Sequence, residues 1–161
     1  MHRIKYHLWV WFAPLLLVSC GREPVTLYYD NGQPRVVIYY DAERQQDGPS
    51  RIYYPHGVVR EASEWAHGKL QGTTRRYYES GNLMQETPYV DGLPDGWVVQ
   101  YYPGGQIRQK TRFKAGNEEG KHEMFREDGT RRLTCTFRAG KVVGKCQYFN
   151  EKNEAIEFPP N

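Results

Sequence analysis

Aromatic residues and glycines recur along the chain at a fixed spacing of 24 residues. The first aromatic series consists of Tyr53, Tyr77, Tyr101, Phe125 and Phe149, and nearly every member is followed by a glycine four residues later. A second aromatic series consists of Trp65, Tyr89, Phe113 and Phe137, and each member is followed by glycines three and seven residues later. Tyr28 joins this first series after one inserted residue. Composition alone does not produce such a register, so the chain is predicted to be an internal repeat.

Each repeat is predicted to be a β-hairpin. The glycines flank short polar segments that mark chain reversals, and the segments between them are rich in aromatic and β-branched residues. Asn153 replaces the last glycine of the first series, as expected where a turn needs a left-handed backbone. No long stretch has apolar residues at helical spacing. The predicted fold is all-β: an elongated, twisted antiparallel sheet of 24-residue hairpin units.

Alternation along the longer strands predicts two unlike faces. In residues 59–65, Val59, Ser63 and Trp65 share one face, because successive side chains of a strand point to opposite sides. The opposite face carries Arg60, Glu64, Glu86, Arg108, Lys110 and Arg112. One face is therefore expected to be apolar and aromatic and the other charged. A single hairpin cannot bury such an apolar face, so neighbouring units are expected to share it edge to edge.

The amino terminus has the layout of a signal peptide over residues 1–19. Arg3 and Lys5 form a positive end, and residues 8–18 are an uncharged run of about 11 residues, too short to cross a bilayer as a helix. The residues Leu17-Val18-Ser19-Cys20 resemble the lipobox of bacterial lipoproteins. This resemblance implies that Cys20 becomes the acylated first residue of the mature chain. The alternative is an ordinary secretory signal that ends in a chance cysteine.

The predicted domain organisation and location follow from this layout. Residues 20–26 are expected to be the anchor and a short linker, residues 27–153 the repeat array, and residues 154–161 a C-terminal tail. The protein is expected in the cell envelope, held at a membrane by lipid. Gly21 rather than Asp after the anchor implies the outer membrane where an envelope has two.

The repeat resembles a known family. The pattern is Tyr-Tyr-x-x-Gly, an aliphatic residue, then aromatic-x-x-Gly-x-x-x-Gly, at residues 77–96 and again at 101–120. It resembles the MORN-variant repeat, of the kind found in YwqK-type antitoxin proteins, over about residues 26–153. The resemblance implies a sheet of successive hairpins and no catalytic activity. The pattern departs at Glu43, where a glycine is expected, and at Arg131, where other units have an aliphatic residue; such atypical terminal units are usual in repeat arrays.

Composition and motifs exclude several classes of function. Loss of Arg3 and Lys5 with the leader lowers the formal net charge from +3 to +1, so a nucleic-acid surface is not expected. His56, His67 and His122 have no partner at metal-ligand spacing, and the acidic residues are spread one or two to a turn. We therefore expect no enzyme activity, no metal site and no cofactor.

The expected function is binding of a protein partner, with a toxin as the partner if the antitoxin resemblance extends to function. Tyr54, Tyr78 and Tyr102 are the candidate contact residues, because they alternate to the face opposite the core aromatics and keep a polar hydroxyl. The alternative is a choline- or cell-wall-glycan-binding repeat protein, since such repeats also combine aromatics with glycine turns. Those repeats are usually shorter and richer in tryptophan.

Cys135 and Cys146 are predicted to form a disulfide. If Phe137 faces Gly144 across the last reversal, antiparallel pairing places Cys135 opposite Cys146. Directly opposed residues have Cα separations of about 4.5 to 5.5 Å, within or at the edge of disulfide reach. An exported compartment is oxidising enough to form the bond. The alternative is two unpaired thiols packed as small apolar side chains.

Overall fold

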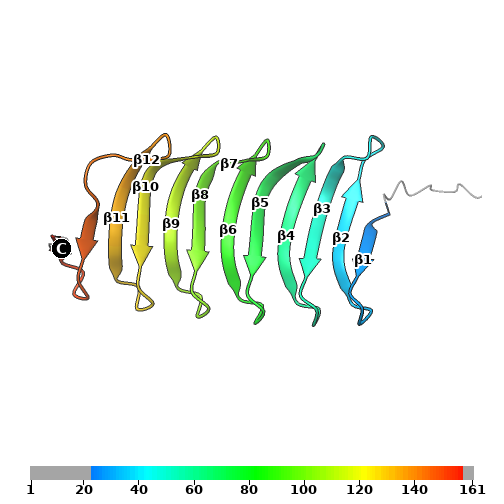
Figure 1. Cartoon of the computed structure of the whole chain (residues 1–161), viewed down its shortest axis with the longest axis horizontal. Helices are drawn as coiled ribbons and strands as arrows, with labels where there is room; N and C mark the ends of the chain where they lie inside the picture. Colours follow the sequence, from blue (N-terminus) through cyan, green and yellow to red (C-terminus); the bar gives the residue numbers. More distant parts are fainter. Residues whose placement is uncertain (1–22, 158–161) are drawn as a thin grey trace, which may run out of the picture.

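The computed structural model describes residues 23–157, and every strand in this range belongs to one antiparallel sheet, which is a single layer of curved strands (Figure 1). The strands are β1 (Val25–Tyr28), β2 (Pro34–Tyr40), β3 (Gln46–Tyr53), β4 (Val59–Ala66), β5 (Lys69–Tyr77), β6 (Leu83–Val90), β7 (Leu93–Pro94), β8 (Gly96–Tyr101), β9 (Ile107–Lys114), β10 (Asn117–Phe125), β11 (Arg131–Arg138), β12 (Lys141–Val142), β13 (Gln147–Phe149) and β14 (Ala155–Ile156). The predicted all-β fold of repeated hairpins is confirmed.

Strands succeed one another across the sheet in the order in which they occur in the chain. The path runs β1-β2-β3-β4-β5-β6-β8-β9-β10-β11-β13-β14, while the two-residue strands β7 and β12 pair only with β6 and β11. Every described pairing is therefore between strands that are close in sequence. The result is a long row of hairpins (Figure 1).

One edge of the array is closed by turns that begin directly after the first aromatic series. In the β3–β4 hairpin the Gly57 amide donates to the Tyr54 carbonyl oxygen (2.9 Å), and the Tyr54 amide donates to the Val58 carbonyl oxygen (2.8 Å). Gly57 has φ +91°, a left-handed conformation that most side chains disfavour. The register also shifts just before Tyr53, as a β-bulge requires. The same pair of hydrogen bonds closes the hairpins at Tyr29, Tyr78, Tyr102, Arg126 and Asn150.

The opposite edge is closed by two-residue turns that end in glycine. Asp91 and Gly92 have φ +50° and +82°, the signature of a type I′ turn, whose twist matches that of the flanking strands. The Gly92 amide also donates to the Leu70 carbonyl oxygen in the preceding unit (2.9 Å). Equivalent bonds join Gly68 to Gln46, Gly116 to Pro94 and Gly140 to Glu118. These bonds tie each tight turn to the neighbouring hairpin.

The β2–β3 hairpin is one residue longer at this edge. Its Asp41 amide donates to the Gln45 carbonyl oxygen (2.9 Å), and Arg44 takes the left-handed position with φ +62°. The inserted residue that offsets Tyr28 from the 24-residue spacing therefore lies in a turn, and the register shift between Ile38 and Tyr40 has a counterpart in β4–β5, between Ala62 and Glu64. It also explains why no glycine is needed at Glu43.

The ends of the array differ slightly from the predicted boundaries. Strand β1 begins at Val25, inside the segment expected to be a linker, and β14 lies inside the expected tail. Strand β14 is two exposed residues paired with β13. So short a strand carries no alternating pattern, and the sequence could not indicate it.

The most buried side chains are small and mostly polar. They are Ser50, Ser63, Thr74, Thr87, Thr111 and Cys135, each at 6% exposure or less. The aromatics of both series are only partly buried wherever the structure describes them, except for Tyr28, which is exposed. The expectation of an aromatic core was therefore wrong in this respect. A single-layer sheet has no second layer to cover large rings, whereas small side chains at mid-strand are covered by their larger neighbours.

Candidate functional site

Strand register separates the two broad faces of the sheet, because directly opposed residues of antiparallel strands point to the same side. The hydroxyl face contains the buried row Ser50, Ser63, Thr74, Thr87, Thr111 and Cys135. The charged face contains the row Arg51, Ala62, Arg75, Glu86, Val99, Lys110, Glu123 and Thr134.

Side chains that lie along the sheet cover the buried row of the hydroxyl face. The Trp65 indole Nε1 donates to Ser63 Oγ (3.1 Å), and the Gln85 amide donates to Thr87 Oγ1 (2.8 Å). Each donor precedes or follows its acceptor by two residues in the same strand, so both point to the same side. The hydroxyls of Ser63 and Thr87 are therefore used within the fold, whereas Thr74 Oγ1 is buried without a hydrogen-bond partner.

His122 lies on the hydroxyl face between two members of this row. It is opposite Thr111 on one side and Cys135 on the other, and its Nδ1 is 2.9 Å from Thr111 Oγ1. The ring meets Phe137 edge-on, with centroids 5.7 Å apart. Burial lowers the pKa of His122 from its usual 6.5, and the charge of Glu118 opposes the shift only in part. Burial therefore favours the neutral form of the imidazole.

The candidate contact residues Tyr54, Tyr78 and Tyr102 each follow a strand and open a turn. The Tyr54 hydroxyl donates to the Tyr77 carbonyl oxygen of the next unit (2.8 Å). The same bond joins Tyr29 to Tyr53, Tyr78 to Tyr101 and Tyr102 to Phe125, at 2.7, 2.7 and 2.9 Å. We call this series the tyrosine ladder. Its hydroxyls bind successive repeats together, so the polar group that favoured these tyrosines as partner contacts is already engaged.

Arg126 occupies the ladder position in the β10–β11 hairpin. Its guanidinium donates to the carbonyl oxygens of Phe149 (2.6 Å) and Arg131 (2.8 Å). Arginine thus replaces tyrosine and keeps the bond to the next unit. The ladder was missed from the sequence, although a signal was present: the second tyrosine of the pair recurs every 24 residues at Tyr54, Tyr78 and Tyr102. Such strict repetition is what a role in the fold requires.

Two arginines in the first half of the charged face, Arg51 and Arg75, contact carboxylates. The Arg75 guanidinium is 2.9 Å from the Glu86 carboxylate, and Arg51 is 3.9 Å from Glu64. Glu86 also accepts a hydrogen bond from Tyr101 (2.9 Å). Burial, followed by this bond and the charge of Glu86, raises the pKa of Tyr101. These contacts orient the side chains of Arg51, Arg75 and Tyr101 and neutralise part of the charge on this face.

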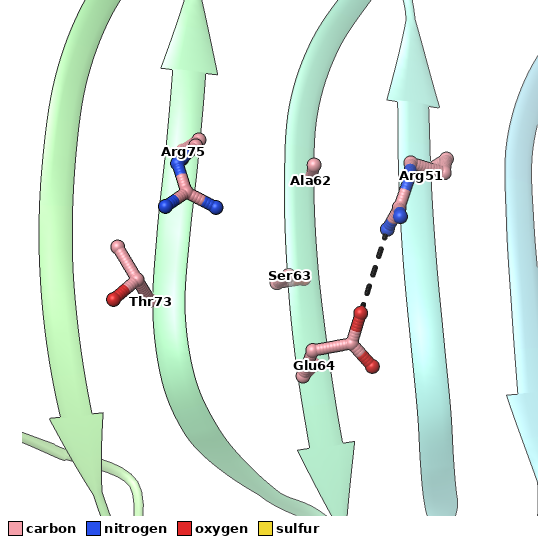
Figure 2. Close-up of a pocket in the computed structure, with 6 residues that line it drawn as sticks. All are labelled: Arg51, Ala62, Ser63, Glu64, Thr73 and Arg75. Carbon is pink, nitrogen blue, oxygen red and sulfur yellow. Dashed lines mark ion pairs between the residues drawn. The ribbon is translucent and has the colours of Figure 1, made fainter.

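An open depression lies over Ala62 in this region (Figure 2). Its volume is about 240 Å³, and Arg51 and Arg75 stand on the strands to either side of the small alanine (Figure 2). The dashed contact in Figure 2 is the ion pair of Arg51 with Glu64. Because both guanidiniums already have carboxylate partners, the depression offers little unmatched charge to a ligand.

Cys135 and Cys146 form a disulfide, with Cα atoms 4.4 Å apart. The premise behind its prediction was wrong in one detail, since Phe137 pairs with Val142 of β12 and not with Gly144. The chain between β12 and β13 restores the predicted register, in which Leu133 pairs with Tyr148. The same register places Cys135 opposite Cys146.

The predicted signal peptide and lipid anchor lie outside the described residues. The signal peptide, residues 1–19, and the proposed anchor Cys20 precede the described range. Within residues 23–157 there is no helix that could cross a membrane. The same range contains no group of three or more His, Cys, Asp or Glu side chains placed to hold a metal ion.

The fold and its two faces define an open, single-layer β-repeat protein held together by contacts between successive hairpins. The family described as MORN repeat variant matches the chain at residues 24–42, 70–91 and 94–115, so the array contains MORN-variant repeats. Each match contains one Tyr-x-x-Gly turn near its middle. The hairpins at Tyr54 and Arg126 have the same turn geometry. No curated protein matches the chain.

Proposed function

We propose that this chain is a membrane-tethered β-repeat module that binds another protein and has no catalytic role. The observation that supports this proposal is a contrast between two kinds of position. The positions of the tyrosine ladder and of the turns recur from unit to unit and hold the hairpins together. Positions on the charged face differ from unit to unit: the slot of Arg75 holds Val99 and then Glu123. Repeat proteins use such extended, variable surfaces for binding.

The tether rests on the lipobox-like residues that end at Cys20. Only four residues separate Cys20 from Val25, the first residue of β1. An extended chain of this length spans about 17 Å at most. An acyl anchor on Cys20 would therefore hold the β1 end of the array close to the membrane and leave the rest of the row to extend from it. Where the envelope has two membranes, Gly21 favours the outer one.

The resemblance to YwqK-type repeats supports an antitoxin- or immunity-like role, with a toxin as the partner. A choline- or cell-wall-glycan-binding role is the competing proposal. The scarcity of tryptophan weighs against that alternative, because residues 23–157 contain only Trp65 and Trp97 whereas choline- and glycan-binding repeats are usually rich in tryptophan.

The test is capture from the native envelope. Cells that express the tagged full chain are treated with a cross-linker, and covalent adducts are purified and identified by mass spectrometry. One protein recovered in stoichiometric yield is the expected result. Retention on choline or glycan resin, with no protein adduct, would replace the proposal by its alternative. Growth rescue by the chain when the captured protein is overproduced would establish the antitoxin-like role.

A further inference from the structure

Trp97 lies on the charged face at a position where the fold does not need a tryptophan. It is 39% exposed and directly opposite Arg112 of β9. One repeat earlier the same slot holds Thr73, and one repeat later it holds Lys121. All three units form the same hairpin, so a large aromatic ring at this slot serves no structural purpose that its neighbours share. Tryptophan and arginine are both among the residues enriched at protein interface hot spots.

Positive charge gathers around this ring. The Lys110 ammonium lies 5.5 Å from the centroid of the Trp97 ring, and Arg112 and Lys121 are both exposed. Lys121 lies on β10 on the same side as Glu123, two residues away, which pairs with Lys110 of the charged face. We call Trp97, Lys110, Arg112 and Lys121 the tryptophan patch.

The charges of the tryptophan patch are poorly matched, unlike those of Arg51 and Arg75, which contact Glu64 and Glu86. Lys110 contacts Glu123 at 3.6 Å, and Glu123 is shared with Arg131 at 3.7 Å. Neither Arg112 nor Lys121 forms an ion pair with any residue in the range 23–157. The patch therefore presents unmatched positive charge, which is complementary to an acidic partner.

The slots of Arg112 and Lys110 are cationic in this unit and not in the units on either side. The slot of Arg112 holds Pro88 in the preceding unit and Thr136 in the next. The slot of Lys110 holds Glu86 and Thr134 in the same two units. A lipid surface or a long polyanion would be matched by a cationic strip that continued along the row. A short cluster around a single aromatic anchor matches one segment of a protein.

We propose that the tryptophan patch is the docking site for an acidic segment of a partner protein, with an apolar side chain of that segment against Trp97. This assignment rests on the proposed protein-binding function and specifies where and what it binds. Carboxylates of the segment pair with Arg112 and Lys121, which are free to reach them.

The test uses a fluorescein-labelled peptide of five glutamates, one leucine and five glutamates as the probe, titrated with the full chain at low salt. The variant Arg112→Glu/Lys121→Glu is expected to weaken binding by about tenfold or more, because charge complementarity is reversed at the contact. Trp97→Thr installs the residue of the preceding repeat, and we expect it to weaken binding by about fivefold. The matched control is Arg60→Glu/Lys69→Glu, which makes the same change in net charge at two exposed residues of β4 and β5. It is expected to change the affinity by less than about twofold.

Several results would overturn the assignment. Equal weakening by the two double variants would show attraction to net charge alone. Binding of phosphatidylglycerol vesicles through Arg112 and Lys121, with no binding of the peptide, would assign the patch to a lipid surface. Equal capture of the native partner by wild type and by Arg112→Glu/Lys121→Glu would remove the patch and leave the protein-binding function standing. Failure of the wild-type chain to capture any protein would remove both. Circular dichroism of each variant establishes that the sheet is intact.

Discussion

The Tyr78 hydroxyl donates a hydrogen bond to the Tyr101 carbonyl oxygen, 2.7 Å away in the next repeat. Tyr78→Phe removes this bond and keeps the ring, so we expect the free energy of unfolding to fall by about 1 kcal/mol. Urea denaturation measures the change, and Tyr28→Phe at the exposed end of β1 serves as the control, with no comparable loss expected. A neutral Tyr78→Phe variant would mean that the ladder does not contribute to stability.

The same variants separate the ladder from partner binding. If Tyr54, Tyr78 and Tyr102 bind a partner through their rings, the triple change to Phe should preserve binding and the triple change to Leu should weaken it, measured by capture of the partner. The triple change to Ser is less informative, because loss of the ladder and loss of contact would coincide.

Two tight turns place alanine where the backbone is left-handed. Ala115 and Ala139 have φ +45° and +49°, a conformation that costs L-residues about 1 to 2 kcal/mol. Asparagine tolerates it better, and Asn-Gly is a preferred type I′ pair. We expect Ala115→Asn and Ala139→Asn each to stabilise the protein by about 0.5 to 1 kcal/mol, measured by thermal denaturation. Ala42→Asn is the control, since Ala42 lies in a turn without positive φ, and a similar gain there would contradict the explanation.

Burial of His122 should make stability depend on pH. Its pKa in the folded protein lies below 6.5, so between that lower value and pH 6.5 the unfolded chain binds more protons than the folded one. Stability is therefore complete above pH 6.5 and falls as the pH drops through this window. His122→Val, the residue one repeat earlier at Val98, should remove that fall in urea titrations. Hydrogen bonds from Thr130 lower the pKa of Asp128 from 3.8, so the effect of Asp128 on stability lies below pH 3.8 and does not overlap that of His122. An unchanged pH profile in His122→Val would refute the assignment.

The disulfide should stabilise the last hairpin. The bond joins cysteines that are 11 residues apart in sequence. For a loop of this length, the loss of chain entropy in the unfolded state stabilises the folded protein by about 2 to 3 kcal/mol. Reduction should increase amide exchange in β13 and β14 first and leave β3 to β6 nearly unchanged, because each unit contacts only its neighbours. Mass spectrometry of the non-reduced protein from the envelope checks the bond itself. Free thiols at both positions there would be the opposing result.

A single substitution at Cys20 tests the proposed lipid anchor. Cys20→Ser should abolish incorporation of labelled fatty acid and release the chain from the membrane fraction, because the acyl chains have no other attachment site in the lipobox-like segment. Cys135→Ser/Cys146→Ser removes the other two cysteines and should leave labelling unchanged. A Cys20→Ser protein that still sediments with membranes would disprove the tether.

The repeat, the hairpins and the assignment of strand residues to one face or the other were predictable because they depend on local chemistry, whereas the apolar character expected of one face was not found, since its buried row is mostly serine and threonine. A tight turn such as Asp91-Gly92 needs particular residues at fixed offsets, and strand alternation then assigns each side chain to a face. The tyrosine ladder was not predictable in the same way, since the Tyr54 bond joins residues 23 apart whose closeness depends on the register between units. The patch around Trp97 was not predictable from sequence spacing either, because its members lie on three strands and meet only through the register of β8, β9 and β10.

Every described strand of the sheet pairs only with strands adjacent or next but one in sequence, as the order β1 to β14 shows. Formation of a hairpin therefore requires no contact with a distant part of the chain. Each new hairpin pairs with the edge strand of the hairpin that precedes it. Such a protein can acquire its structure progressively from the amino terminus while the remainder is still threading through a ribosome tunnel or a translocation pore. Whole 24-residue units could also be gained or lost in evolution without disturbing the rest, because an exact deletion rejoins one edge to an equivalent one.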